Sequence, residues 1–123
     1  MMQVKVKFKG FAQFEPRISQ GADSLVKGRE YPVLEMFSQA DGQNYFRIEY
    51  SENEIPALFD SRLFEMTDAR IPSSWSPVLE WDGSVVLQPI AWSMSGFWEA
   101  FTDHDQWAVE IYRVERDRLM RQA

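Results

Sequence analysis

Residues 31–64 read YPVLEMFSQADGQNYFRIEYSENEIPALFDSRLF. The stretch consists of short apolar runs separated by turn-forming residues, with Asp41-Gly42 at the first reversal and residues 51–53 at the second. Apolar runs of this length with turn signals between them are typical of an antiparallel meander. The stretch therefore predicts the sheet of a small β-barrel, and the flanking segments are interpreted around it.

The flanking segments extend this sheet and then change character. Residues 3–9 alternate apolar side chains with lysines, which predicts a half-buried strand. Asp82-Gly83 lies between the apolar runs 78–81 and 84–88, and this dipeptide is a strong hairpin signal. The prolines of 67–77 indicate a crossing loop before that hairpin.

The last part of the chain predicts helices. Residues 95–101 are expected to form a short helix, and Thr102 and Asp105 have the spacing of a capping box that opens a longer one. In the longer helix, Trp107, Ile111 and Val114 fall on one stripe with Arg118, beside Ala108, Tyr112 and Leu119. The predicted fold class is α+β, mainly antiparallel β. We expect a single domain over 1–123, with a barrel-like sheet at 3–67 and a hairpin plus helical extension at 68–123 packed on it.

The pattern in residues 3–67 resembles the Src-homology-three family of small β-barrels. The features that match are the first strand, a long loop at Gly10 to Ser24, the Leu25-x-x-Gly28-x-x-Tyr31-x-Val33 lead-in, the two hairpins and the segment 58–65. The resemblance implies a short helical turn at 60–62 before the last barrel strand. It does not extend to the proline-rich ligand groove, because Asp60 and Leu63 stand where that family has a proline and a tyrosine.

Composition limits the kinds of site that the chain can form. It has 123 residues and no cysteine, which excludes disulfides and thiolate metal sites. No window approaches the ~20 apolar residues of a membrane span, and residues 1–5 lack the apolar run of a signal peptide. We therefore expect a cytoplasmic protein with no membrane partner.

Charge is distributed unevenly along the chain. Residues 31–110 carry fourteen Asp and Glu against three Arg, an excess of eleven acids, whereas both ends are weakly basic. An acidic centre repels phosphates, which disfavours nucleic acid as a partner, and it accelerates encounter with a basic protein. The alternative is that acidic residues serve only solubility.

No set of residues predicts a catalytic or metal site. His104 is the only histidine, and it lacks the second His or Cys that a metal site of this kind would need. No Gly-x-Ser-x-Gly elbow is present, and no cofactor is expected. An enzyme that uses the clustered carboxylates Glu49, Glu52 and Glu54 stays open as a third hypothesis, because their separation in space is not fixed by sequence.

The five tryptophans allow two interpretations. Trp75, Trp81, Trp92, Trp98 and Trp107 either pack between the sheet and the helices or line a binding surface. Core packing is favoured for each of them. Trp75 is the expected exception, because it lies in a polar segment.

The general character of the chain resembles immunity proteins of bacterial toxin systems. The resembling segments are 25–65 and Gly96-Phe97-Trp98-Glu99. The resemblance implies a non-enzymatic module that binds a basic toxin domain and occludes it. The expected contact residues are Glu49, Glu52, Glu54, Asp60 and, as an aromatic anchor, Trp75. The alternative is a regulatory or adaptor barrel that binds a peptide segment within a larger complex.

Overall fold

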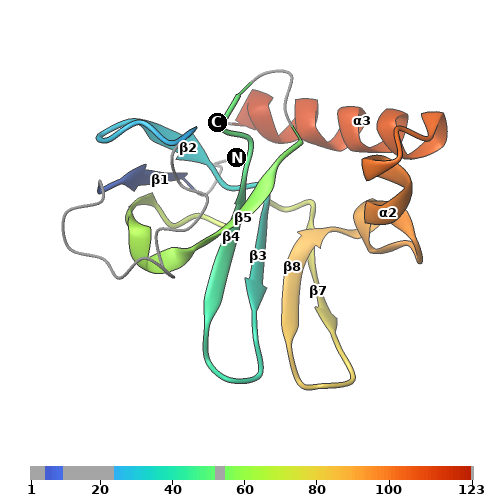
Figure 1. The fold of residues 1–123 in the computed structure, drawn as a ribbon, viewed down its shortest axis with the longest axis horizontal. Coiled ribbons are helices and arrows are strands. Elements are labelled where there is room, and N and C mark those ends of the chain that lie inside the picture. Colours follow the sequence, from blue (N-terminus) through green and yellow to red (C-terminus); the bar gives the residue numbers. More distant parts are fainter. Residues whose placement is uncertain (1–4, 10–23, 52–54, 123) are drawn as a thin grey trace.

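The computed structural model describes residues 5–9, 24–51 and 55–122 (Figure 1). Within these residues, the elements in chain order are β1 (Lys5–Phe8), β2 (Glu30–Pro32), β3 (Glu35–Ser38), β4 (Asn44–Ile48), β5 (Ala57–Asp60), the 3-10 turn η2 (Ser61–Leu63), β6 (Phe64–Asp68), β7 (Trp75–Leu79), β8 (Val85–Pro89), the 3-10 turn η3 (Ile90–Ser93), α2 (Phe97–Thr102) and α3 (Gln106–Gln122). The predicted α+β class, mainly antiparallel β, is confirmed.

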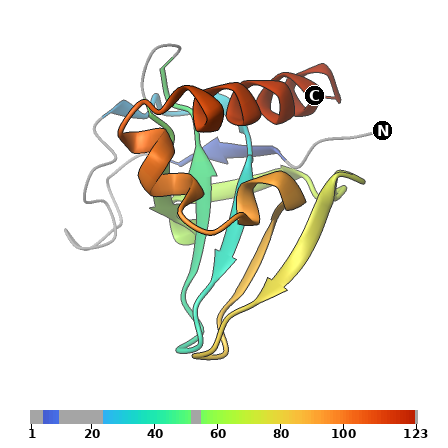
Figure 2. The ribbon, with the colours of Figure 1, turned by 90° about the vertical axis from the view of Figure 1, so that its right-hand side faces the viewer.

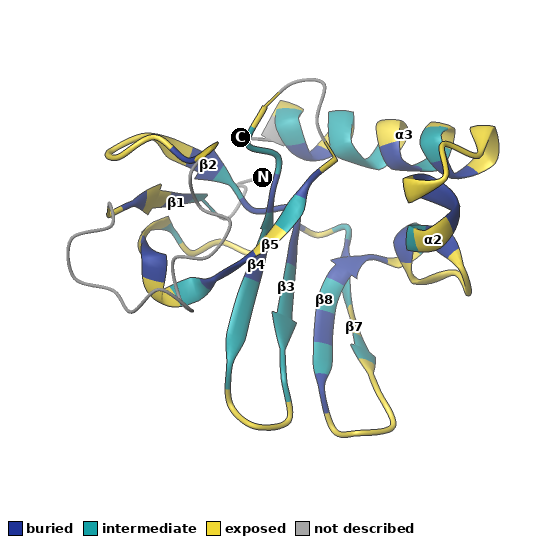
Figure 3. Ribbon diagram, viewed as in Figure 1, coloured by how far each residue is buried: buried dark blue, intermediate teal, exposed yellow. Residues whose placement is uncertain are grey.

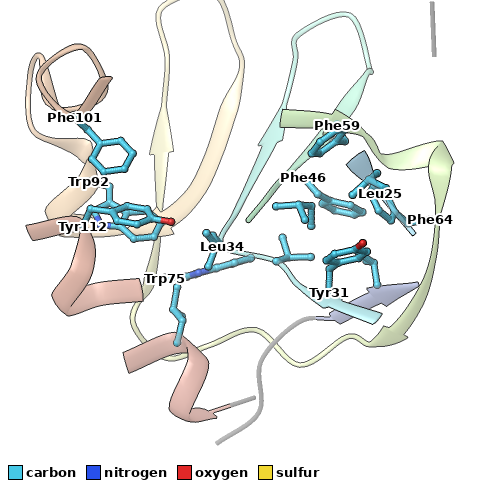
Figure 4. Close-up of a cluster of buried hydrophobic side chains, with 14 of the residues drawn as sticks. Leu25, Tyr31, Leu34, Phe46, Phe59, Phe64, Trp75, Trp92, Phe101 and Tyr112 are labelled. Atoms are coloured by element: carbon cyan, nitrogen blue, oxygen red, sulfur yellow. The ribbon is translucent and has the colours of Figure 1, made fainter. Parts of the chain in front are cut away.

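The strands form two antiparallel sheets. One has the order β2-β1-β6, and the other has the order β5-β4-β3-β8-β7. The chain passes from one sheet to the other between β2 and β3, where Val33 and Leu34 are fully buried. Aromatic side chains from both sheets, including Phe46 and Phe64, pack in the space between them (Figure 4). Phe8 of β1 also contacts Phe64, at 6.2 Å between ring centroids.

Two of the predicted strand boundaries were wrong. The segment 67–77 is not a loop throughout, because β7 begins at Trp75 and pairs with β8 from Trp75↔Pro89 onward. Pro77 fits within this strand because β7 is the outer strand of its sheet, where a missing N–H costs no ladder hydrogen bond. The strand expected from Ile55 begins at Ala57 instead.

The helices cover one face of the five-stranded sheet and form a second aromatic cluster with η3. Tyr112 of α3 stacks on Phe101 at 4.4 Å between ring centroids and on Trp92 at 5.3 Å. Ala108, Tyr112 and Leu119 are the buried residues of α3, whereas Trp107 and Val114 are exposed. The predicted stripe was therefore displaced by about one residue, because η3 and α2 present their rings to Tyr112. The predicted capping box was also wrong, since Thr102 is the last residue of α2 and α3 begins at Gln106.

The β3–β4 and β7–β8 hairpins project side by side away from α3 (Figures 1 and 2). Their loops are built alike: Gly42 N–H donates to Gln39 O and Gly83 N–H to Glu80 O. Each loop then closes with the hydrogen bond Gln39 N–H to Gln43 O or Glu80 N–H to Ser84 O. The glycine follows a tight turn in each, with a φ of +94° at Gly42 and +91° at Gly83. This is the pattern of a three-residue hairpin loop with a glycine bulge.

Replacing Gly83 tests this account of the loop. Gly83→Ala is expected to lower the free energy of unfolding by about 1–2 kcal/mol, because a Cβ is disfavoured at positive φ. Steric conflict adds little, since the nearest atom to that Cβ is the Ala40 Cβ at 3.6 Å. Gly83→Asn is the matched control and should cost less, because asparagine tolerates this region. Equal urea midpoints for Gly83→Ala and the parent chain would contradict the assignment.

Candidate protein-interaction surface

Glu35 is the most buried carboxylate of the described residues, with 3% of its surface exposed. Arg47 from the neighbouring strand donates to it, with 2.8 Å between Arg47 Nε and Glu35 Oε2. The guanidinium also lies 3.9 Å from the centroid of the Trp98 ring. Burial raises the pKa of Glu35, and the charge and hydrogen bond of Arg47 oppose that rise. Glu35 therefore belongs to the contact between the sheet and α2, and Arg47 supplies its counter-charge.

Glu49 makes a second contact between the sheet region and a helix, here α3. Its carboxylate accepts from Tyr112 Oη at 2.8 Å, and from Arg116 at 2.7 Å to Oε1 and 3.0 Å to Oε2. The side chain of Glu49 is 8% exposed. Burial and the neighbouring Glu49 charge raise the pKa of the Tyr112 hydroxyl, so that it stays a donor. Arg116 thus binds Glu49 with two hydrogen bonds, the strongest arrangement for this pair.

Among the residues expected to contact a partner, those that the structure describes do not form one acidic face. Asp60 is buried and accepts from the backbone N–H and the guanidinium of Arg62. The Glu49 side chain is held by Tyr112 and Arg116 of α3 and is 8% exposed, and Glu52 and Glu54 lie outside the described residues. The expectation that Trp75 is exposed was wrong, because β7 places it between the sheets with 8% of its surface exposed.

Chemistry at His104 receives no support from its surroundings. His104 is exposed in the turn between α2 and α3, with a φ of +62°. Among the described residues, no three His, Asp or Glu side chains are close enough to hold a metal ion together. Of the described carboxylates, Glu35 and Asp60 are buried and the Glu49 side chain is 8% exposed, and each of the three accepts hydrogen bonds from an arginine.

Trp81 lies at the tip of the β7–β8 hairpin and is fully exposed, at 106% of its reference area. Leu79, two residues before it, is 77% exposed. The loop of the other hairpin lies against this one, since Ala40 N–H donates to Ser84 Oγ at 3.2 Å. Figure 3 shows both loops as exposed. We call Asp41, Glu80, Trp81 and Asp82 the tip surface.

The tip surface is strongly acidic. It holds three carboxylates, and no Lys or Arg occurs anywhere in residues 71–112. Asp82 accepts from Ser84 N–H at 2.9 Å, which lowers the pKa of its carboxyl and keeps it charged. Asp41 accepts from Gln43 N–H in the same way at 3.0 Å. These bonds fix two of the three charges beside an indole ring with its faces in solvent.

Sequence reasoning placed Trp81 in the core by default. The alternation of the apolar run 78–81 suggested a strand, yet the strand ends at Leu79 and Trp81 stands in the loop. The equivalent position in the other loop is occupied by Ala40. The signal that could have identified Trp81 was its place one residue before Asp82-Gly83, with an acid on either side.

Comparisons with protein-family models, with curated proteins and with solved structures found no match to this chain. Among its described residues, no helix is long and apolar enough to cross a membrane.

Proposed function

We propose that this chain is a non-enzymatic protein-binding module that docks a basic partner on the tip surface. The observation that carries the proposal is the fully exposed Trp81 with carboxylates on both sides of it in the chain. A large exposed aromatic costs little side-chain entropy on binding and is typical of interface hot spots. Its ring also attracts a Lys or Arg side chain, which the neighbouring carboxylates attract as well.

The most specific form of the proposal is an immunity protein that neutralises a bacterial toxin in the cytoplasm by occluding it. A toxin domain that acts on nucleic acid or on another anionic substrate presents a basic face, and an acidic tip surface complements such a face. Arginine binding of Glu35, Glu49 and Asp60 favours the non-enzymatic hypothesis over the carboxylate enzyme, since these groups already have counter-charges.

Co-expression tests this proposal. The protein encoded by the gene adjacent to this one is expressed in a bacterial host, alone and together with the chain. We expect growth arrest in the first case and recovery in the second. A neighbour that is harmless, or that stays toxic in the presence of the chain, would contradict the immunity hypothesis.

The charge of the tip surface is tested separately. The triple variant Asp41→Asn, Glu80→Gln and Asp82→Asn should slow association with the partner by about tenfold at low salt and much less at high salt. The amides keep the side-chain shapes and the acceptors for Gln43 and Ser84. The matched control neutralises the exposed acids Glu99, Asp103 and Glu110 of the helical layer. Stopped-flow rates that drop equally in both triples would assign the effect to net charge alone.

The alternative function is a regulatory or adaptor barrel that binds a peptide. The strand orders β2-β1-β6 and β5-β4-β3, with η2 just before β6, support the small-barrel resemblance. This function would be favoured over the immunity protein if the chain bound its partner weakly and bound a short linear peptide from that partner with the same affinity.

A further inference from the structure

An apolar groove opens between the two sheets. Its walls include Met36, Phe46, Met66, Ile71, Trp75 and Leu87. Its volume is about 150 Å³, which is enough for one benzene-sized group. Met66 and Ile71 at the rim are 48% and 58% exposed, so the groove is open to solvent rather than sealed in the core.

An apolar strip on one face of the β7–β8 hairpin extends from the groove toward the tip surface. Leu87 pairs with Pro77, and Val85 pairs with Leu79. Side chains two residues apart in a strand share a face, and Trp75 and Leu87 both line the groove. Pro77, Leu79 and Val85 therefore lie on the groove side of the sheet. This apolar strip runs from the groove to the end of β7, two residues before Trp81, and its members Pro77 and Leu79 are exposed.

The strip fixes a distance between two kinds of contact. Within β7, Leu79 lies four residues beyond the groove residue Trp75, which is about 13 Å at the rise of about 3.3 Å per residue in a strand, and Trp81 follows in the loop. The groove has apolar walls, and the tip surface carries three carboxylates and an indole. A single polypeptide segment that satisfied both would carry an apolar side chain at one point and cationic side chains about 13 Å or more away.

We propose that the groove takes one branched aliphatic or aromatic side chain of the basic partner, from the same segment whose Lys or Arg side chains reach the tip surface. This inference rests on the proposed function, and it assigns the partner a two-part recognition segment. Charge complementarity selects the basic end, and the volume and apolar walls of the groove select the other end. A basic segment without the apolar side chain would leave the groove empty and bind weakly.

Selection from displayed random 12-residue peptides tests the inference on the full chain. The parent chain should enrich peptides that combine Leu, Ile, Met or Phe with Arg or Lys. Two groove variants follow: Ile71→Ser removes part of the rim, and Ala69→Phe places a ring in the groove, which Ala69 helps to line. Both should bind the enriched peptides about tenfold more weakly, the effect of losing roughly 50 Å² of apolar contact. Val114→Ser on α3, where Val114 is 57% exposed, is the matched control and should bind like the parent.

The outcomes separate the two proposals. Enriched peptides that are basic but indifferent to apolar residues, with Ile71→Ser binding like the parent chain, would overturn the groove assignment and leave the tip surface in place. Enriched peptides that are apolar without basic residues, with Trp81→Ala binding normally, would overturn the tip surface and leave the groove. If the parent chain enriched no peptides beyond those that the Trp81→Ala and Ala69→Phe variants enrich, both proposals would be overturned.

Discussion

Replacing Arg47 with methionine is expected to lower the free energy of unfolding by about 3–5 kcal/mol, because it leaves the buried Glu35 carboxylate without its counter-charge. Arg47 is itself nearly buried, with 14% of its side chain exposed, and Glu35 has 4%. The substitution also removes the donor to Pro56 O at 3.3 Å and the cation over the Trp98 ring. Urea unfolding monitored by tryptophan fluorescence measures the loss.

A double variant separates the unpaired charge from lost packing. Glu35→Leu combined with Arg47→Met should recover most of the stability, because an apolar pair can replace a buried ion pair at little cost. A double variant as unstable as Arg47→Met would assign the loss to packing around Trp98. A single Arg47→Met variant within 1 kcal/mol of the parent would show that Glu35 does not depend on Arg47.

The same single variant should acquire a distinctive pH dependence. Burial already raises the pKa of Glu35, and removing Arg47 removes the effects that oppose that rise. A carboxyl whose pKa is higher in the folded than in the unfolded chain binds its proton more tightly when folded. Its contribution is therefore favourable at low pH and is lost as the pH rises from the ordinary value of 4.5 through the raised pKa. Arg47→Met should thus lose stability over this range more steeply than the parent chain.

Trp81→Ala is expected to weaken partner binding by about 2–4 kcal/mol, or roughly 30-fold to 1,000-fold, as for other central aromatic hot spots. Its effect on the free energy of unfolding should be below about 0.5 kcal/mol, because the ring is fully exposed and makes no core contact. Titration calorimetry with the partner identified by co-expression measures the first quantity, and thermal unfolding measures the second.

Trp107→Ala is the matched control for this experiment. Trp107 is 42% exposed on α3 and meets the edge of Phe97 at 6.2 Å between centroids. Its removal should cost some stability and leave the affinity unchanged. Equal affinity losses for the two variants, or an unchanged affinity for Trp81→Ala, would remove Trp81 from the binding site.

Local sequence patterns were sufficient where the structure depends on neighbouring residues. The alternation of 3–9 and the Asp-Gly dipeptides led to β1 and to both projecting hairpins. The site was much less predictable. Glu49 and Arg116 are 67 residues apart, and nothing in either segment indicates that they pair. Glu49 therefore read as a free surface acid, although α3 covers it with Tyr112 and Arg116.

By itself, the sequence determined the fold class, the two Asp-Gly hairpins and the acidic balance, because strand alternation and turn chemistry act over a few residues. It did not show that the run from Tyr31 to Phe37 divides into two strands, β2 and β3, in different sheets. Only the tertiary structure decided which tryptophans are buried and which carboxylates form ion pairs with arginine. Trp75 and Trp81 are six positions apart and both have polar neighbours in the sequence. Trp75 is nevertheless buried between the two sheets, whereas Trp81 is fully exposed to solvent. Burial depends on which distant segments pack over a residue, and that packing brings together parts of the chain that share no local signal.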